Sequence, residues 1–141
     1  MFSKLPGSIP ISVLRALRTW LTSPGWIVPL WIWKPLPKVV FSTTLSEVQG
    51  NARLASGSLA EEIELLRAEP AEGEIAIGGA TLAAEAAEQD LIDEYRAMVH
   101  PVLVGGGIPF FPRRERREDL ELVETRTFSS KIVYLRYRVV R

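Results

Sequence analysis

Residues 75–82 read Ile-Ala-Ile-Gly-Gly-Ala-Thr-Leu, and this stretch decides the fold prediction. Its apolar start predicts a short buried strand, the glycine pair predicts a tight turn, and Thr81 can cap the helix that follows. Glycines let backbone N–H groups approach an anion closely, and a helix N-terminus adds about half a positive charge there. The stretch therefore predicts either an anion site or a turn needed only for close packing of a strand and a helix.

A strand and a helix are expected before this stretch. Residues 38–42 form an apolar run that is typical of a buried strand. Ser58 begins a capping box with Glu61, and apolar residues then recur at helical spacing until Pro70. The order strand, helix, strand, helix is typical of an α/β layer with parallel strands.

The last third of the chain predicts further strands. Residues 93–100 lead into a strand, which residues 102–104 can continue before the glycine run at 105–107. Residues 120–128 and 132–140 alternate in polarity around a polar turn, so they predict an antiparallel hairpin.

Composition limits the classes of function. The chain has 141 residues, enough for one domain, and is 47% apolar and 24% charged. Its formal net charge is zero, which provides no general basic field for nucleic acid. It has no cysteine, so disulfides, thiolate metal sites and cysteine nucleophiles are excluded and a cytoplasmic location is expected. The single histidine, His100, would leave carboxylates to supply most ligands of a zinc site, so we predict no metal.

The first 33 residues differ in composition from the rest. Residues 1–38 hold five basic and no acidic residues, and all four tryptophans lie before residue 34. We therefore expect an atypical segment at 1–33 and the main domain at 34–141. Residues 13–21 have helical spacing, but no stretch reaches the ~20 apolar residues of a spanning helix and no secretory cleavage site follows, so no membrane partner is expected. A surface-lying amphipathic helix and an irregular segment beside the main domain both stay open.

Hydroxyl side chains follow the first predicted strand of the main domain. Ser42, Thr43 and Thr44 come where that strand ends. In open α/β sheets, ligands bind outside the carboxyl ends of the strands, so we expect this loop to lie beside the Gly78-Gly79 turn. Its hydroxyls can then receive a phosphate, although an ordinary polar loop would have the same composition.

Four other features have simpler structural explanations. His100 has no cysteine or evident serine elbow to pair with, so we expect a core or edge-strand histidine. Asp93 and Glu94 are adjacent, and their side chains would point opposite ways in a strand, which favours a salt bridge at the strand entry over an acid/base pair. The glycines at 105–107 are compatible with a ligand flap or a plain loop. The arginines within 113–119 are interleaved with acidic residues, which indicates a solvated face.

Five segments occur in a recognisable order. They are Lys38-Val-Val-Phe-Ser-Thr-Thr-Leu45, Gly78-Gly-Ala-Thr-Leu82, Leu91-Ile-Asp-Glu-Tyr95, Pro101-Val-Leu-Val-Gly-Gly-Gly107 and Pro109-Phe-Phe111. In this order they resemble the dihydrofolate reductase-like family, which includes the reductase domain of the bifunctional riboflavin-pathway deaminase–reductase. The resemblance covers about residues 34–141. It implies a three-layer α/β/α fold on a mixed, mostly parallel sheet ending in an antiparallel hairpin, with NADPH as hydride donor and a homodimer as the assembly.

The resemblance also implies which residues hold the cofactor. Ser42 and Thr43 match the place beside its adenosine end. The turn that carries its pyrophosphate is matched by Gly78, Gly79, Ala80, Thr81 and Leu82. Thr43 stands where family members often have an arginine suited to a 2′-phosphate, so NADH is an alternative to NADPH. Ile77 stands where the flavin-pathway reductases have a substrate-facing glutamate, which argues against that substrate.

Residues 1–33 do not resemble the first strands of the family. We therefore expect a domain that is incomplete at its N-terminus, and the catalytic residues stay unassigned. The expected function is an NADPH-dependent reductase that transfers a hydride to a pterin-like or other heterocyclic small molecule. Two alternatives stay open: an inactive truncated remnant that binds nucleotide or dimerises, and the riboflavin-pathway 5-amino-6-(5-phosphoribosylamino)uracil reductase.

Overall fold

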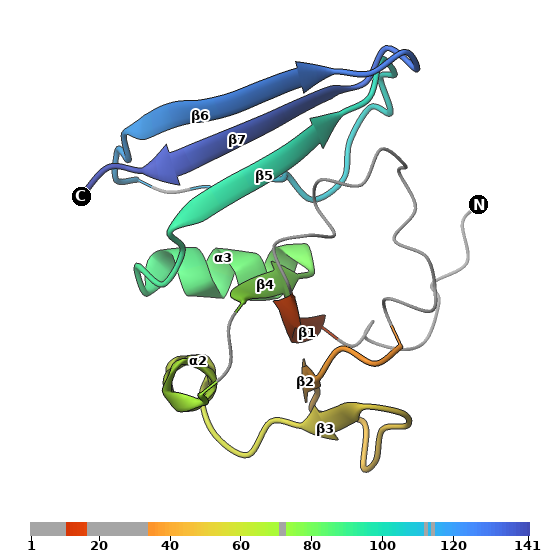
Figure 1. Cartoon of the computed structure of the whole chain (residues 1–141), viewed down its shortest axis with the longest axis vertical. Coiled ribbons are helices and arrows are strands. Elements are labelled where there is room, and N and C mark those ends of the chain that lie inside the picture. The colour runs from red at the N-terminus through yellow and green to blue at the C-terminus, as the bar shows by residue number, and fades with distance from the viewer. Residues whose placement is uncertain (1–10, 17–33, 71–72, 112, 114) are drawn as a thin grey trace. The chain divides into compact units, whose positions relative to one another are not determined.

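The computed structural model describes residues 11–16, 34–70, 73–111, 113 and 115–141 (Figure 1). The chain divides into two compact units, residues 1–82 and 83–141. The elements of the first unit are β1 (Ile11–Ala16), β2 (Lys38–Phe41), β3 (Ala52–Leu54), α2 (Leu59–Ala68), β4 (Glu74–Gly78) and the start of α3 (Ala80–Glu88). The second unit holds the rest of α3 with β5 (Glu94–Val99), β6 (Leu120–Thr127) and β7 (Val133–Val139). The predicted mixed α/β class is confirmed.

The first unit is built on a four-stranded sheet with the strand order β3-β2-β1-β4. Strand β1 runs antiparallel to both of its neighbours, whereas β2 and β3 are parallel. Strands β2 and β4 therefore run in the same direction, as a chain of strand–helix units requires, but β1 lies between them. Our expectation of a mostly parallel sheet does not describe these pairings, because β1 adds an antiparallel ladder on each of its two sides.

Strand β1 corrects one local prediction. Helical spacing was expected over residues 13–21, but residues 11–16 are a strand, and residues 17–21 lie outside the described residues. The backbone of β1 pairs with β2 on one side and with β4 on the other, and this double ladder outweighs the local pattern. The predicted boundary near residue 33 also falls outside the described residues.

Helix α2 begins and ends where the sequence predicts. Ser58 accepts a hydrogen bond from the backbone N–H of Glu61, whose side chain accepts one from the backbone of Ser58, so both halves of the capping box are present. The helix stops before Pro70. Its inner face places Leu59, Ile63 and Leu66 in the core, each no more than 3% exposed. Neither α2 nor any other helix in the described part of the chain has the length and apolar character needed to cross a bilayer.

The second unit holds an antiparallel sheet with the order β5-β7-β6. The predicted hairpin is confirmed: β6 and β7 pair around a turn in which Lys131 has φ +67°. The predicted salt bridge at the entry of β5 is confirmed as well. Glu94 accepts two hydrogen bonds from Arg136, at 2.5 and 2.9 Å, and one from Arg96 at 2.9 Å, while Asp93 pairs with Arg141.

Strand β5 ends earlier than predicted. Residues 102–104 were expected to continue it, but the strand stops at Val99 and a loop follows. Pro101 has no backbone N–H to donate to a ladder, and the Val102 N–H turns back to the His100 carbonyl at 2.8 Å. His100 is exposed directly after β5, which lies at one edge of this sheet, so it is not the core histidine that was one of our two expectations.

Candidate functional site

The turn between β4 and α3 has the geometry expected from its glycines. Gly78 is the last residue of β4, and Gly79 adopts φ +95°, a conformation that L side chains rarely reach. Helix α3 begins at once with Ala80. The first N–H groups of a helix have no partner within it, and the first turn of α3 contains no acidic residue that would compete for them. The turn therefore presents backbone donors and the positive end of the helix dipole, which suits an anion.

The helix cap at this turn differs from the expectation. Thr81 was expected to cap the helix, but α3 starts at Ala80, so Thr81 lies exposed within its first turn. Leu82 is only 3% exposed, so its side chain anchors the helix in the core. From the general geometry of helix starts, we expect the backbone N–H groups of Gly79, Ala80 and Thr81 to be the donors that a ligand at this turn would meet.

The hydroxyl loop after β2 is shaped by its own first residue. The Oγ of Ser42 accepts hydrogen bonds from the backbone N–H groups of Thr44, at 3.2 Å, and Leu45, at 3.1 Å. These contacts make a compact turn and occupy the lone pairs of the Ser42 oxygen. Thr43 and Thr44 are exposed, so their hydroxyls are the accessible ones. Ser42 therefore positions the loop, and Thr43 is better placed to meet a ligand.

The strand register brings this loop and the glycine turn to one edge of the sheet. The start of β1 pairs Ile11 with Phe41, the last residue of β2, and Ser12 with Gly78, the last residue of β4. The carboxyl ends of β2 and β4 therefore lie level with each other. One strand separates them, which places them about 10 Å apart. The expected shared edge is present, although the two junctions are not on adjacent strands.

A buried carboxylate beside α2 escaped the sequence analysis. Glu62 is 0% exposed. It accepts hydrogen bonds from Arg53 at 2.6 Å, from the backbone and hydroxyl of Ser56 at 2.6 and 3.0 Å, and from the Gly57 N–H at 3.4 Å. The sequence does contain the partners of this carboxylate, an arginine and a Ser-Gly-Ser run just before the helix. The capping box explained the last serine of that run, so the run gave no separate indication of a buried carboxylate.

These contacts fix the charge of Glu62. The bond from Arg53 lowers the pKa of the Glu62 carboxyl to about 2, against the opposing effect of burial, and the Ser56 contacts lower it further. A group that stays ionised at neutral pH and is fully engaged cannot act as a general acid. Glu62 therefore has a structural role: it fastens the β3–α2 connection to the start of the helix.

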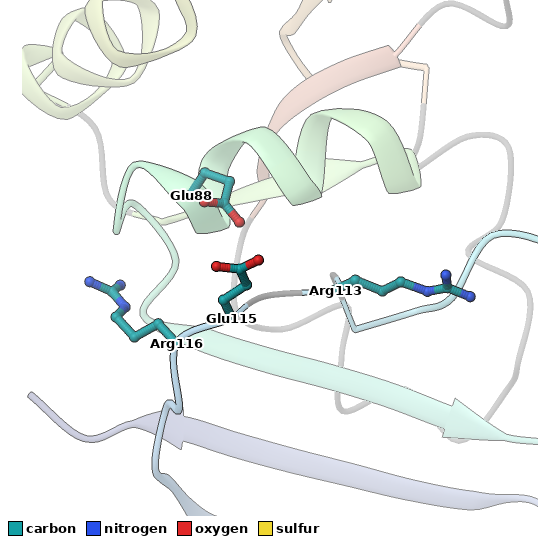
Figure 2. Close-up of a pocket in the computed structure, with 4 residues that line it drawn as sticks. All are labelled: Glu88, Arg113, Glu115 and Arg116. Atoms are coloured by element: carbon teal, nitrogen blue, oxygen red, sulfur yellow. The ribbon is translucent and has the colours of Figure 1, made fainter.

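A polar hollow in the second unit is a poor active site. Its volume is about 440 Å³, and it is lined by Glu88, Arg113, Glu115 and Arg116. In Figure 2 the carboxylates of Glu88 and Glu115 lie near each other, while Arg113 and Arg116 extend to opposite sides. Arg116 is paired with Asp90. These four residues provide no apolar wall for a nicotinamide or pterin ring.

The described residues of the arginine-rich segment 113–119 form a solvated face, as predicted. Arg113, Arg116 and Arg117 are exposed, and Arg117 pairs with Asp119 at 2.7 Å. Arg114 lies outside the described residues. Among the described residues no three histidine, aspartate or glutamate side chains gather in a way that could hold a metal ion.

Comparison with known proteins identifies the family. The family model of the RibD C-terminal domain matches residues 19–134, most of the chain. The protein YyaP of Bacillus subtilis strain 168, which is uncharacterized, is 37% identical over 100 residues, covering 71% of this chain and 53% of its own length. The resemblance to the riboflavin-pathway reductase domain is thereby confirmed. The match starts inside residues 1–33, and the boundary we expected at residue 33 stays a prediction.

Two solved structures share the fold. A crystal structure described as that of a riboflavin biosynthesis protein from Shewanella sp. PV-4 has a TM-score of 0.64 and 29% identity, over 73% of this chain and 60% of that one. A pyrimidine reductase-like protein from Corynebacterium diphtheriae has a TM-score of 0.53 and 16% identity, over 86% of this chain and 55% of that one. At that identity the second likeness concerns the fold alone. The chain spans between half and two thirds of the length of each of these relatives.

Proposed function

Because this chain belongs to the RibD C-terminal domain family, we propose that it binds a nicotinamide dinucleotide, with NADPH as the expected form, and reduces a heterocyclic small molecule. The observation that carries the proposal is the placement of two nucleotide-compatible loops at one edge of the sheet. The Gly78-Gly79 turn opens onto α3, and the Ser42–Thr44 loop lies level with it across β1. An extended dinucleotide can reach both loops, whereas a single small anion would use only the turn.

Each loop has a defined role in this proposal. The backbone N–H groups of Gly79, Ala80 and Thr81 would hold the pyrophosphate, since charge-assisted bonds to backbone donors are the strong ones. The hydroxyl of Thr43 would meet the adenosine end, on a loop whose shape Ser42 fixes. When bound, the cofactor supplies the hydride, and the protein positions it. The side chain of Ile77 is half-buried in β4 and cannot hydrogen-bond a substrate.

Two classes of substrate are candidates for the proposed reductase. Ile77, in the place of a substrate-facing glutamate, favours a heterocycle other than the riboflavin-pathway pyrimidine. The 29% identity to the protein described as belonging to riboflavin biosynthesis supports that pyrimidine as the second candidate. A third candidate is a domain that binds nucleotide or dimerises without turnover.

A gain-of-function substitution tests the adenosine end of this site. Thr43→Arg should tighten binding of NADPH about tenfold and leave NADH unchanged, because one charge-assisted bond to the 2′-phosphate contributes about 1.5 kcal/mol or more. Fluorescence titration of both cofactors measures the two affinities. Thr43→Gln, which adds length without charge, is the matched control and should change neither affinity. An equal gain for NADH, or no gain at all, would place the adenosine end elsewhere.

A further inference from the structure

A third strand–helix junction lies at the edge of the sheet that carries the candidate nucleotide site. Strand β3 runs parallel to β2, and their pairing continues up to Val40 and Leu54. The Ala55 N–H then donates to the Val40 carbonyl at 2.9 Å, so the end of β3 lies level with the end of β2. Helix α2 follows β3 along the chain (Figure 1). The carboxyl ends of β3, β2 and β4 therefore share one edge of the sheet.

Arg53 places a guanidinium at this edge. Its Nη2 donates to the Glu62 carboxylate at 2.6 Å, and its Nη1 donates to the Leu54 carbonyl at 3.5 Å. Glu62 lies in the first turn of α2, and Leu54 is the last residue of β3. Since both acceptors lie at the carboxyl edge, the guanidinium lies there as well. The side chain of Arg53 is 47% exposed, so a ligand can reach it.

The bond to Glu62 leaves Arg53 with donors for a ligand. A guanidinium has more N–H groups than the two bonds to Glu62 and Leu54 use. Glu62 in turn accepts from the Ser56 hydroxyl and from the backbone N–H groups of Ser56 and Gly57. The carboxylate is thus engaged by neutral donors as well as by the arginine, and it is fully buried. The exposed member of this ion pair is the cation.

The other described basic residues of the first unit have places elsewhere in the fold. Residues 39–52 contain no lysine or arginine, so the Ser42–Thr44 loop has no cation of its own. The others belong near or before the amino ends of β2 and β4, or to the last turn of α2: Arg15, Lys34, Lys38 and Arg67. Among the described residues of this unit, Arg53 is therefore the basic residue whose place in the sheet is at the carboxyl edge.

We propose that Arg53 recognises the 2′-phosphate of NADPH and makes this chain prefer NADPH to NADH. The proposal rests on the proposed cofactor site and names the residue that sets its selectivity. A cofactor with its pyrophosphate at the Gly78-Gly79 turn and its adenosine ribose at Thr43 runs from β4 toward β2, and β3 is the next strand along that edge. Neighbouring strands lie about 4.8 Å apart, a distance that an arginine side chain spans. Arg53 would thus supply, from the next strand, the cation that position 43 lacks.

Glu62 is the positioning residue for this arginine. It holds one side of the planar guanidinium, so less conformational freedom is lost when the remaining N–H groups meet a phosphate. The hydrogen bond from Arg53 to Glu62 also raises the pKa of the arginine above its ordinary value, so the guanidinium stays charged. A charged, oriented fork suits a phosphate dianion better than it suits the neutral 2′-hydroxyl of NADH.

The ratio of the dissociation constants of NADH and NADPH tests the proposal, because the 2′-phosphate is the difference between them. Fluorescence titration of the full chain should give a ratio of about ten or more for the wild type. In the double variant Arg53→Gln/Glu62→Gln the ratio should fall to about one, while the affinity for NADH changes less than about threefold. Both members of the pair are replaced because loss of the arginine alone would leave a buried carboxylate without its cation. A purely structural role of Arg53 would weaken both cofactors equally and leave the ratio unchanged.

Arg67→Gln is the matched control. The Arg67 side chain is 45% exposed, close to the 47% of Arg53, and it also pairs with a glutamate of α2. This variant should keep the wild-type ratio. If the double variant does not fold, Arg53→Lys takes its place, since it keeps a positive charge opposite Glu62. An ammonium lacks the planar fork that can serve a carboxylate and a phosphate together, so the ratio should fall at least about threefold.

Each contrary result has a distinct meaning. Equal affinities of the wild type for NADPH and NADH would overturn the proposal and leave the cofactor site in place. A wild-type ratio that persists in the double variant, or in Arg53→Lys if that is the variant that folds, would assign the 2′-phosphate to another residue. An equal fall of the ratio in Arg67→Gln would attribute the preference to general positive charge. A folded wild type that binds neither cofactor would overturn the proposed cofactor site and this proposal together.

Discussion

Glu62→Gln should destabilise the protein by about 3 kcal/mol at pH 7. The pKa of Glu62 falls from 4.5 to about 2 on folding, and each unit corresponds to about 1.4 kcal/mol of preference for the charged form. Glutamine approximates the neutral form, keeps the volume, and leaves Arg53 without its carboxylate. Urea unfolding at constant m-value measures the change.

The matched control for this substitution lies on the same helix. Glu64 is exposed and pairs with exposed Arg67, so Glu64→Gln should cost no more than about 0.5 kcal/mol. A loss for Glu62→Gln as small as that of the control would mean that the contacts of the buried carboxylate do not hold in solution.

The pH dependence of the same variant gives an independent check. The pKa of Glu62 is lowered in the folded state, so its contribution is complete above pH 4.5 and is lost as the pH falls toward 2. The stability difference between the wild type and Glu62→Gln should therefore shrink over this window. Glu61 and Glu94 also have lowered pKa values, but they are present in both proteins and cancel in the difference. A difference that stays constant down to pH 2 would assign the loss to packing instead of charge.

Gly79→Val should weaken NADPH binding by ten- to a hundredfold. A β-branched residue at φ +95° is strained by about 1–3 kcal/mol, and its side chain would project from the turn where the pyrophosphate is expected. The loss of one or two charge-assisted bonds, at about 1.5–3 kcal/mol each, accounts for the size of the effect. Calorimetric titration of the folded variant measures it.

Gly50 supplies the control for backbone strain. It has φ +73° in a loop of the same unit, with open space around it, and it is not part of the candidate site. Gly50→Val should therefore lower the stability of the protein by a similar amount while leaving the affinity for NADPH unchanged. Equal loss of binding in the two variants would show that strain, and not the turn itself, is responsible.

The sequence predicted those parts of the fold that depend on local signals. The capping box at Ser58, the glycine turn at Gly78-Gly79 and the alternation of the C-terminal hairpin each act within a few residues, so each is visible in one window of sequence. Strand β1 was missed because its conformation depends on two ladders with strands more than 20 residues away. Strand pairing of this kind can override a local helical period.

The candidate site was predictable to a similar extent. The rule that ligands bind at carboxyl ends of strands correctly placed the Ser42–Thr44 loop and the glycine turn at one edge. This rule could not show that β1 lies between the loop and the turn. It also could not show that the Ser42 oxygen accepts hydrogen bonds from the backbone of its own loop. Glu62 was missed because its partners approach only after β3 and α2 have folded together, which no residue spacing reveals.

Titration calorimetry of the wild-type chain with NADPH tests the proposed function most directly. We predict saturable binding of one NADPH per chain, with a dissociation constant on the order of 10 µM, and we predict that Gly79→Val weakens it while Gly50→Val does not. The proposal would be contradicted if the folded wild-type chain showed no saturable binding of NADPH or NADH at concentrations up to about 1 mM. A dissociation constant of 1 mM corresponds to a binding free energy of about −4 kcal/mol.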